Sequence, residues 1–440
     1  MKPRNLLIAA IVLVILCGAV WWSRKHPQAS PTGSSATTSP KLVDVPEAQV
    51  QSLDLTKKGG TSLDLQRQNG KWAITSPEAL PADQDAVTSM LSSLSPVTAD
   101  SVVEANPKDI GQYGLNSPSL TVAIHEKSGK TDTLLFGDDV PAGSLVYARL
   151  NADPKVYVVS SSVKSSFDKS PNDLRDKRLL TFDSNSLTRI ELVSANEDIE
   201  FGKNNRNEWQ IVKPQPCRAD NFQVEELLRK LTDAKMDLSG SAEDQKKADA
   251  SFASGQRVAT VKVTDGSGTQ TLEVQKNKDD YYAKSSVVKG DYKLSSDLGK
   301  ELEKPLDDFR NKKIFDFGFS DPNRIEIQQG SSGKTLVRSG TDWKLNGKTM
   351  DSGSVQALID KLRDLSAAKF VPSGFTTPAL TIGVTSDDGK RVEKAEFAKV
   401  GDSYIARRVN DAAVYQLDVK SINDILVTNN AIKPAASGKK

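Results

Sequence analysis

The sequence predicts an α+β protein made of three tandem repeats, each a mainly antiparallel sheet with one principal amphipathic helix. Two observations predict this class. A tryptophan recurs in one context as Trp72, Trp209 and Trp343, with 137 residues between the first two and 134 between the last two. An aspartate and an amphipathic segment then follow each tryptophan at matching distance. We therefore expect one fold unit to occur three times.

Each tryptophan lies in a predicted β-hairpin. Alternating apolar residues such as Leu63 and Leu65 come first, and Asn69-Gly70 then forms a dipeptide typical of tight hairpin turns. The tryptophan strands span residues 70–74, 207–211 and 341–345. We expect these side chains to fill the core of each repeat rather than to contact a ligand.

A predicted helix follows each tryptophan strand, over residues 83–95, 220–234 and 351–367. Apolar residues recur at i, i+4 and i+7, which places them on one helical face. The leading aspartates can accept hydrogen bonds from the free amides of the first turn. These aspartates are Asp83, Asp220 and Asp351, and the apolar positions are Val87, Leu91, Leu94, Val224, Leu228, Leu231, Val355, Ile359 and Leu362.

A β-rich half closes each repeat. Alternating pairs predict half-buried strands, and the pairs are Val122 and Ile124, Val261 and Val263, and Ile382 and Val384. Three tyrosines, Tyr157, Tyr292 and Tyr415, each follow an equivalent alanine by the same number of residues. The sequence therefore predicts repeat 1 at residues 47–180, repeat 2 at 181–315 and repeat 3 at 316–430, followed by a disordered tail at 431–440.

An apolar run at the N-terminus predicts a membrane anchor. Residues 6–22 carry no charge, and Arg24 and Lys25 close the run. Seventeen helical residues span ~25 Å, close to the ~30 Å of a hydrocarbon core. We expect a transmembrane helix over about residues 6–22, inside an anchor at 1–25, and then a flexible Pro/Ser/Thr linker at 26–46. The short basic start favours placing the rest of the chain outside the cytoplasm.

Two other interpretations of this segment stay open. Cys17 and Ala19 form a loose small-x-small pattern, so the run could be a cleaved signal peptide. Cys17 could also be a lipoprotein acylation site, although Leu16 before it is a poor match to the small residue expected there. Both alternatives also export the rest of the chain.

The composition argues against several classes of function. Lys and Arg number 59 against 57 Asp and Glu, and this net charge of +2 gives no overall field for nucleic acid. The two cysteines, Cys17 and Cys217, predict no intramolecular disulfide, and the two histidines, His26 and His125, leave little histidine chemistry. We expect no catalytic, cofactor-binding or metal-binding residues, no cofactor, and a protein that is not an enzyme.

Four sequence features resemble functional sites but favour structural roles. Gly330–Thr335 lacks the upstream glycine of a phosphate-binding loop and favours a hairpin turn. Cys217 stands where repeat 1 has Leu80, which indicates apolar packing. His125 favours a solvent-facing strand position, and the pairs Asp138-Asp139 and Asp387-Asp388 favour turns over calcium loops.

A basic cluster marks each boundary between repeats. The first contains Arg175, Lys177 and Arg178, and the second contains Arg310, Lys312 and Lys313. Such clusters favour salt bridging and solvation of a linker. Contact with an anionic surface, such as lipid headgroups or an envelope polymer, is the alternative.

The chain resembles the bacterial membrane proteins grouped as domain-of-unknown-function family 4340. The resemblance rests on the basic start, the apolar span, the tryptophan strand, Tyr113-Gly114-Leu115 near Pro118, and Phe136-Gly137 before Tyr147-Ala148-Arg149. It implies a bacterial envelope protein in the inner membrane, single-pass, with the bulk of the chain in the periplasm. Family members often sit genetically beside transporter components, and the family supplies no catalytic residues.

Three functional hypotheses follow. The leading one is a non-catalytic protein-binding or scaffold module accessory to a membrane transport complex, held by the bilayer through its N-terminal helix, with no nucleic-acid partner. The second is a binding module for an envelope glycan or lipid, with a groove where one repeat differs and exposed aromatics near Tyr113 or Tyr281. The third is a hydrolase with Ser, Lys or Asp side chains converging in one repeat.

Overall fold

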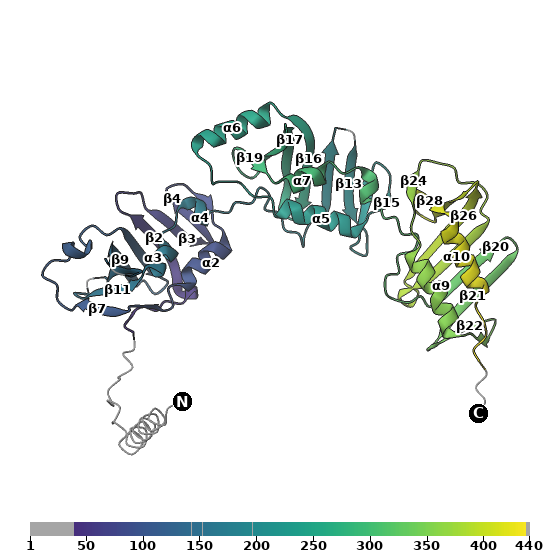
Figure 1. Ribbon diagram of the computed structural model, residues 1–440, viewed down its shortest axis with the longest axis horizontal. Helices are drawn as coiled ribbons and strands as arrows, with labels where there is room; N and C mark the ends of the chain where they lie inside the picture. The colour runs from purple at the N-terminus through teal and green to yellow at the C-terminus, as the bar shows by residue number, and fades with distance from the viewer. Residues whose placement is uncertain (1–38, 142, 152, 196, 437–440) are drawn as a thin grey trace, which may run out of the picture. The chain divides into compact units, whose positions relative to one another are not determined.

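The computed structural model describes residues 39–141, 143–151, 153–195 and 197–436 (Figure 1). The predicted anchor at 1–25, with Cys17 and the apolar run 6–22, lies outside the described residues, as does most of the predicted linker. Within the described residues, no helix is both long and apolar enough to cross a membrane. The chain divides into two compact units, one ending at Asp176 and one beginning at Lys177.

The first unit contains repeat 1, which forms a nine-stranded antiparallel sheet in the order β5-β4-β3-β2-β8-β9-β10-β11-β7. A separate two-stranded sheet pairs β1 with β6. The strands are β1 (Lys41–Val43), β2 (Val50–Lys57), β3 (Leu63–Gln68), β4 (Lys71–Ser76), β5 (Leu80–Pro81), β6 (Val97–Thr98), β7 (Ser101–Glu104), β8 (Leu120–Glu126), β9 (Thr131–Asp139), β10 (Leu145–Leu150) and β11 (Val156–Ser160). The helices are η1 (Glu47–Gln49), α2 (Gln84–Ser92), η2 (Gly111–Tyr113), α3 (Ser161–Phe167) and α4 (Pro171–Leu174).

The second unit contains repeats 2 and 3. Repeat 2 forms an eight-stranded antiparallel sheet in the order β15-β14-β13-β12-β16-β17-β18-β19. Its strands are β12 (Arg189–Ser194), β13 (Asp198–Lys203), β14 (Trp209–Lys213), β15 (Cys217–Arg218), β16 (Gln256–Asp265), β17 (Gly268–Asn277), β18 (Asp280–Ser285) and β19 (Asp291–Leu294). Its helices are α5 (Asn221–Thr232), α6 (Ala242–Ala253), α7 (Ser296–Leu302) and α8 (Leu306–Phe309).

Repeat 3 forms a nine-stranded antiparallel sheet in the order β23-β22-β21-β20-β25-β26-β27-β28-β24. Its strands are β20 (Arg324–Gln329), β21 (Ser332–Ser339), β22 (Asp342–Leu345), β23 (Lys348–Thr349), β24 (Lys369–Val371), β25 (Leu380–Ser386), β26 (Arg391–Val400), β27 (Ser403–Arg408) and β28 (Val414–Asp418). Its helices are α9 (Ser352–Asp364), η3 (Asp387–Gly389) and α10 (Val419–Asn430).

The three large sheets share one topology, which confirms an α+β fold with mostly antiparallel strands. In each sheet the first strand of the repeat pairs with the strand that follows the helical segment, and equivalent apolar residues face each other across this pair. The facing residues are Leu53 and Ile124 in repeat 1, Ile190 and Val263 in repeat 2, and Ile325 and Val384 in repeat 3. Trp72, Trp209 and Trp343 are buried at equivalent places in β4, β14 and β22, as predicted.

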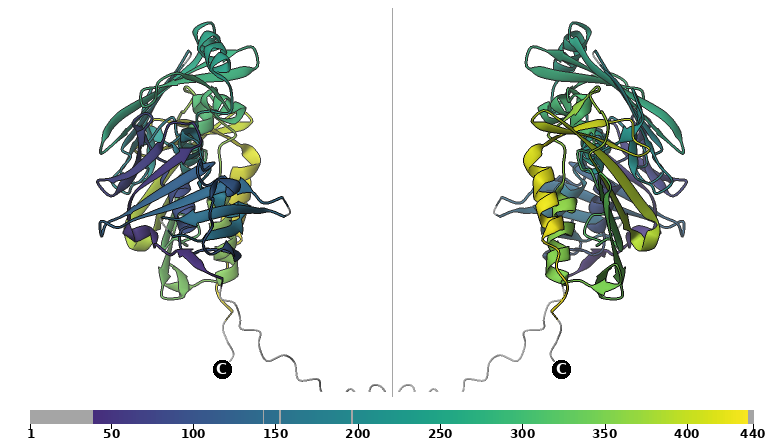
Figure 2. Two further views of the ribbon diagram at one scale, coloured as in Figure 1. Left: turned by 90° about the vertical axis from the view of Figure 1, so that its left-hand side faces the viewer. Right: turned by 90° about the vertical axis from the view of Figure 1, so that its right-hand side faces the viewer.

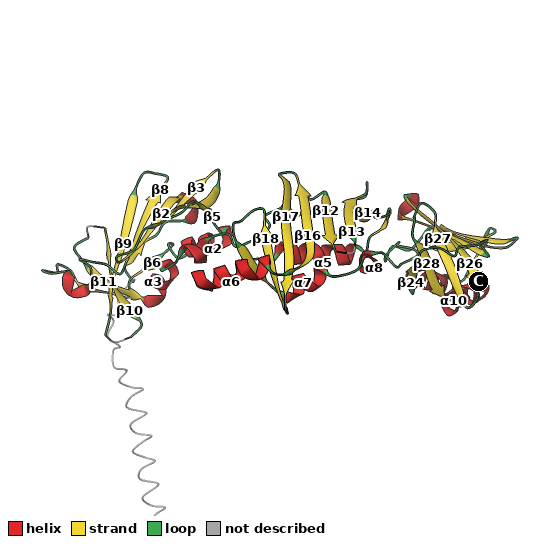
Figure 3. Ribbon diagram, turned by 90° about the horizontal axis from the view of Figure 1, so that it is seen from above, coloured by secondary structure: helices red, strands yellow, loops and turns green. Residues whose placement is uncertain are grey.

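Helices cover one face of each sheet (Figure 3). The principal helices α2, α5 and α9 match the predicted segments, and Asp83, Asp220 and Asp351 cap them as expected. A second helix follows the last strand of each meander: α3, α7 or α10. Figure 2 shows α10, in yellow, running along the third sheet beside α9. The prediction of one principal helix per repeat is therefore incomplete, because two helices are needed to cover so wide a sheet.

Repeat 2 protects its sheet edge with a helix in place of a strand. Repeats 1 and 3 end in the edge strands β7 and β24, whereas α6 lies beside β19 in repeat 2. The Gln245 side chain donates to the carbonyl oxygen of Asp291 at 2.8 Å, and the Asp291 amide donates to the Asp249 carboxylate at 3.2 Å. These bonds satisfy edge groups that would otherwise be open to another chain.

Two predicted flexible segments are partly folded. The predicted linker at 26–46 includes β1, and Leu42, Val43 and Val45 are buried in the core of repeat 1. The predicted tail at 431–440 pairs with repeat 3 as far as Ala435, whose amide donates to the carbonyl oxygen of Thr349 at 3.0 Å. Burial of apolar side chains explains the first correction, and backbone pairing next to β23 explains the second.

The Tyr113-Gly114-Leu115 motif is explained by a close backbone approach. A methyl group at Gly137 would overlap the carbonyl oxygen of Tyr113, and one at Gly114 would overlap Asp138. Gly114 also has a φ of +72°, which favours glycine. Leu115 is buried beneath this contact. The motif therefore fastens the loop that contains η2 onto β9.

We expect Gly137→Ala to lower the free energy of unfolding of the first unit by about 3 kcal/mol, because the added methyl group forces two backbones apart. Urea-induced unfolding followed by circular dichroism measures this loss. Gly60→Ala, also in the first unit, is the control, since a methyl group there meets only ordinary contacts. Equal stability of Gly137→Ala and the parent chain would contradict this account of the motif.

Candidate functional site

The principal and second helices of repeat 2 are joined by a buried ion cluster. Glu301 on α7 is 1% exposed, and its two carboxylate oxygens lie 2.5 Å from Lys230 Nζ on α5 and 2.5 Å from Lys304 Nζ. Lys304 also donates to Gln223 Oε1 at 2.9 Å. Two ammonium groups thus surround one carboxylate between the helices. Interaction with Glu301, opposed by burial, raises the pKa of Lys230.

Repeat 3 carries the same helix–helix contact in an exposed form. Lys361 on α9 is equivalent to Lys230, and Asp424 on α10 is equivalent to Glu301. Lys361 Nζ lies 3.3 Å from Asp424 Oδ2, and the two side chains are 50% and 41% exposed. The position of Lys304 is taken by Val427, so this pair lacks the second ammonium group.

Repeat 1 replaces this pair with two serines. Counting from the capping residues of each helix, Ser93 is equivalent to Lys230 and Ser166 to Glu301. Ala86 likewise replaces Gln223, whereas Lys169 keeps the lysine of position 304. A cavity of about 570 Å³ occupies this place, and Ser89, Asp168 and Asp173 also line it. The cavity exists because three long polar side chains are shortened.

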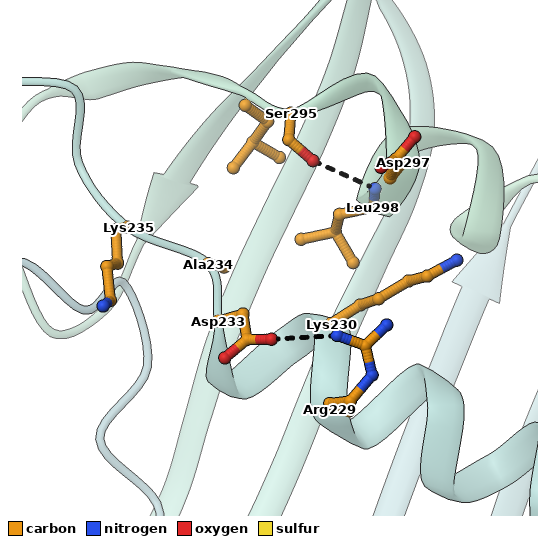
Figure 4. Close-up of a pocket in the computed structure, with 9 residues that line it drawn as sticks. Arg229, Lys230, Asp233, Ala234, Lys235, Ser295, Asp297 and Leu298 are labelled. Carbon is orange, nitrogen blue, oxygen red and sulfur yellow. Dashed lines mark hydrogen bonds and ion pairs between the residues drawn. The ribbon is translucent and has the colours of Figure 1, made fainter.

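A second hollow in repeat 2, of about 360 Å³, lies between the end of α5 and the start of α7 (Figure 4). Charged side chains line it, and several of them form ion pairs. Arg229 Nη1 lies 3.1 Å from Asp233 Oδ2, and Arg229 also contacts Glu226 at 2.7 Å. Ser295 accepts from the Leu298 amide and caps α7. The charges of Arg229 and Asp233 in this hollow are therefore already paired.

Repeats 2 and 3 are joined by a shared core and an ion network. The hydrophobic core runs from Leu179 to Ile425, and the second unit begins at Lys177, a few residues before the boundary predicted at 181. Arg218 on β15 reaches into repeat 3, where its guanidinium lies 3.5 Å from Asp411 and 3.7 Å from Asp316. Tyr415 donates to Asp411 at 2.7 Å, and burial raises the pKa of this tyrosine. These contacts hold the two repeats as one unit.

The linker between repeats 2 and 3 is fastened on both sides by its backbone. Arg310 pairs with Ala219 next to β15, and Lys313 pairs with Ser366 after α9. Arg310 also forms an ion pair with Asp307 at 2.9 Å. In the first basic cluster, Arg175 pairs with Ala82. Residues of both basic clusters therefore help to hold the linkers in place. Contact of the clusters with an anionic surface stays a prediction.

The outer face of each sheet, opposite the helices, differs between the repeats. One row of facing residues crosses four strands in each sheet, and in repeat 3 it exposes two valines, Val337 at 40% and Val392 at 70%. The rows are Gln66, Ser52, His125 and Thr131 in repeat 1; Gly202, Arg189, Thr264 and Thr269 in repeat 2; and Val337, Arg324, Thr385 and Val392 in repeat 3. We call the last of these the valine row.

The residues singled out in the sequence mostly occupy the structural positions expected for them. Gly330–Thr335 forms the turn between β20 and β21 and the start of β21. Cys217 is buried, and burial raises the pKa of its thiol. His125 lies on the outer face of β8, with its ring nitrogens 2.9 Å from Asp54 and 3.0 Å from Thr131.

Two expectations need correction. Asp387-Asp388 forms the expected turn, but Asp138-Asp139 ends strand β9 instead, because β9 continues past Gly137 to pair with β10. Tyr281 is 2% exposed, so it offers no exposed aromatic surface; its ring packs against Gly299. Tyr113 is half-buried, lies 4.9 Å from the Tyr147 ring and donates to Glu104 at 2.7 Å.

Metal ligands do not gather in the part of the chain that the structure describes. Within residues 39–141, 143–151, 153–195 and 197–436, no group of three or more His, Cys, Asp or Glu side chains could hold a metal ion. The sequence reasoning did not find the helix–helix pairs. Comparing residues 93, 230 and 361 with residues 166, 301 and 424 across the repeats would have revealed them, once the second helix was recognised.

The fold and these contacts define a repeat protein with an antiparallel sheet and two covering helices in each repeat. The chain belongs to the family described as "Domain of unknown function (DUF4340)", whose model matches residues 72–207 and 209–382. The resemblance seen in the sequence is thereby confirmed at the level of the family. No curated protein matches the chain.

Among solved structures, the chain has a distant likeness to the DNA polymerase sliding clamp from Pseudomonas aeruginosa. The identity is 8%, the match covers 86% of this chain and 93% of the clamp, and the TM-score is 0.16. At these values the likeness supports no conclusion about fold or function.

We expect Glu301→Gln to cost several times more stability than Asp424→Asn. The first change leaves two lysines beside a buried site without a counter-charge, and breaking such a pair costs about 3–5 kcal/mol. The second breaks an exposed pair, which is worth about 0–1 kcal/mol. Urea-induced unfolding of both variants provides the comparison. Equal losses would show that burial does not distinguish the two contacts.

Proposed function

We propose that this protein is a non-catalytic scaffold that binds a protein subunit of a membrane transport complex. Residues 6–22 anchor it in the bacterial inner membrane as a single-pass helix, and the three repeats extend into the periplasm. This proposal combines the sequence of the N-terminal segment with the family to which the chain belongs.

The observation that carries the proposal is the valine row of repeat 3. Val337 and Val392 are exposed on an open sheet face, with Arg324 and Thr385 between them. The buried core of a protein–protein interface is more apolar than the rest of the surface, and arginine is enriched in interfaces. Repeats 1 and 2 carry polar residues or glycine at the equivalent positions, so the row distinguishes one repeat from its copies.

Rigidity supports the same function. The ion network around Arg218 and the core shared by repeats 2 and 3 fix the frame that carries the valine row. A preformed surface loses little conformational entropy when a partner binds. The lysine and carboxylate side chains of the repeat 2 helix pair are engaged with one another, which fits a structural role better than catalysis.

Site-specific photocrosslinking tests the partner. A photoreactive amino acid at position 392 in the full chain, in native membranes, is expected to crosslink to one membrane-transport subunit identified by mass spectrometry. The matched control is position 269 in repeat 2, where Thr269 is exposed and occupies the place of Val392. Crosslinks at both positions, or at neither, would contradict the proposal.

A charge variant gives an independent test. Val392→Glu is expected to reduce recovery of that subunit in mild detergent by about tenfold, because it buries an unpaired carboxylate in the interface. Thr269→Glu should leave recovery unchanged. Both variants should melt like the parent chain, since both positions face solvent. Unchanged recovery with Val392→Glu would place the interface elsewhere.

A further inference from the structure

The same space between two helices is filled in repeat 2 and open in repeat 1. In repeat 2 the side chains of Gln223, Lys230, Glu301 and Lys304 occupy it and bond to one another. In repeat 1 three of these four are reduced to alanine or serine, and a cavity of about 570 Å³ takes their place. The fourth position remains a lysine, Lys169.

Lys169 has lost the carboxylate that its counterpart uses. Lys304 contacts Glu301 at 2.5 Å, but the equivalent residue in repeat 1 is Ser166, which has no charge. Among the residues that the structure describes, no ion pair of Lys169 is found. Of the two carboxylates that line the cavity, Asp168 lies 2.6 Å from Lys57 Nζ, and Asp173 accepts from the Ser170 amide at 2.8 Å.

We propose that this cavity binds a small ligand through one oxyanion group, a carboxylate or a phosphate, which takes the place that the Glu301 carboxylate occupies in repeat 2. Lys169 supplies the positive charge, and the hydroxyl group of Ser93 supplies a neutral hydrogen-bond donor. The Ser166 hydroxyl donates to the carbonyl oxygen of Ser162 at 3.0 Å, so Ser166 contributes space and no competing charge. A half-buried ammonium group gains more from an anion than an exposed one does, because less water screens the pair.

The lining also limits what the ligand can be. The volume lies within the range of about 300–1,000 Å³ that is typical of sites for small molecules. Asp168 and Asp173 repel further negative charge, so a polyanion is disfavoured, while Ser89 can bond a hydroxyl or amine substituent. The ligand is therefore a compact molecule with a single oxyanion, either soluble or the exposed headgroup of a lipid.

Calorimetric titration of the purified full chain, in neutral detergent at low salt, tests the site. The probes are acetate, inorganic phosphate, glycerol 3-phosphate and the short-chain lipid dihexanoyl phosphatidylglycerol. At least one should bind with a Kd below about 5 mM, as a single charge-assisted contact with supporting hydroxyls allows. Binding of the lipid alone identifies a headgroup, whereas comparable binding of acetate or a phosphate identifies a soluble ligand.

Three variants assign the binding to this cavity. Lys169→Met removes the charge, and Ser166→Glu rebuilds the carboxylate of repeat 2 inside the cavity; each should weaken binding by about tenfold or more. Lys361→Met, at the equivalent helix contact of repeat 3, is the control and should leave binding unchanged. Melting curves check that all three variants remain folded.

Two results would overturn the proposal. One is the failure of every probe to bind with a Kd below about 5 mM, the value expected of such contacts. The other is binding of unchanged strength by either Lys169→Met or Ser166→Glu. Neither result bears on the partner of repeat 3, because the crosslinking at position 392 uses a different surface in the other compact unit.

Discussion

The structure depends on one constraint: each wide antiparallel sheet has an apolar face that a single helix cannot cover. Two helices therefore share the task in every repeat. They contact each other in repeats 2 and 3, and in repeat 1 a cavity lies where they approach each other. Their buried side chains, such as Leu91 and Phe167 in repeat 1, provide the apolar contact with the strands. Outside this apolar layer, polar side chains of the two helices lie near each other and need hydrogen-bond or ion-pair partners. The apolar core fixes the place where the two helices approach each other, which we call the meeting point. The polar residues at the meeting point can therefore differ between the repeats.

The three repeats carry different polar residues at this meeting point of the two helices. Repeat 2 closes it with a carboxylate between two lysines, repeat 3 with one exposed ion pair, and repeat 1 leaves it open. Buried ion pairs add little net stability over apolar packing, but they tolerate no missing partner. In repeat 1, Ser93 and Ser166 replace both the lysine and the carboxylate of the ion pair. Neither of these two positions therefore carries an unpaired charge. The fold therefore survives the change, and the space becomes available for a ligand.

The two candidate surfaces lie on different layers. The cavity of repeat 1 belongs to the helical layer, whereas the valine row of repeat 3 belongs to the outer face of a sheet. Divergence at both places leaves the buried residues of the repeats alike, since Ile124, Val263 and Val384 keep the same facing positions. A triplicated fold can thus acquire separate contacts without altering its cores.

Local sequence signals predicted much of the fold. The tryptophan hairpins and the principal helices with Asp83, Asp220 and Asp351 as caps could be read directly, because their periodicity and capping residues are local. Two of the second helices were missed because α3 and α7 have only seven residues, too few to establish a period. The third, α10, has twelve residues, so its length does not explain why it was missed. The predicted linker and tail proved to be partly folded, because the burial of Val45 and the pairing of Ala435 depend on distant residues. The cavity could not be predicted, because its prediction requires the knowledge that Ser93 and Ser166, far apart in sequence, line the same space.

Hydrogen–deuterium exchange of the full chain tests most directly whether the meeting point of the two helices controls the behaviour of each repeat. Peptides from α2 and α3 should exchange faster than peptides from α5 and α7, because repeat 1 lacks the ion cluster. An oxyanion that fills the cavity should slow exchange in α2 and α3 and leave α5 and α7 unchanged. Equal protection of both helix pairs, with no response to any oxyanion, would contradict the account.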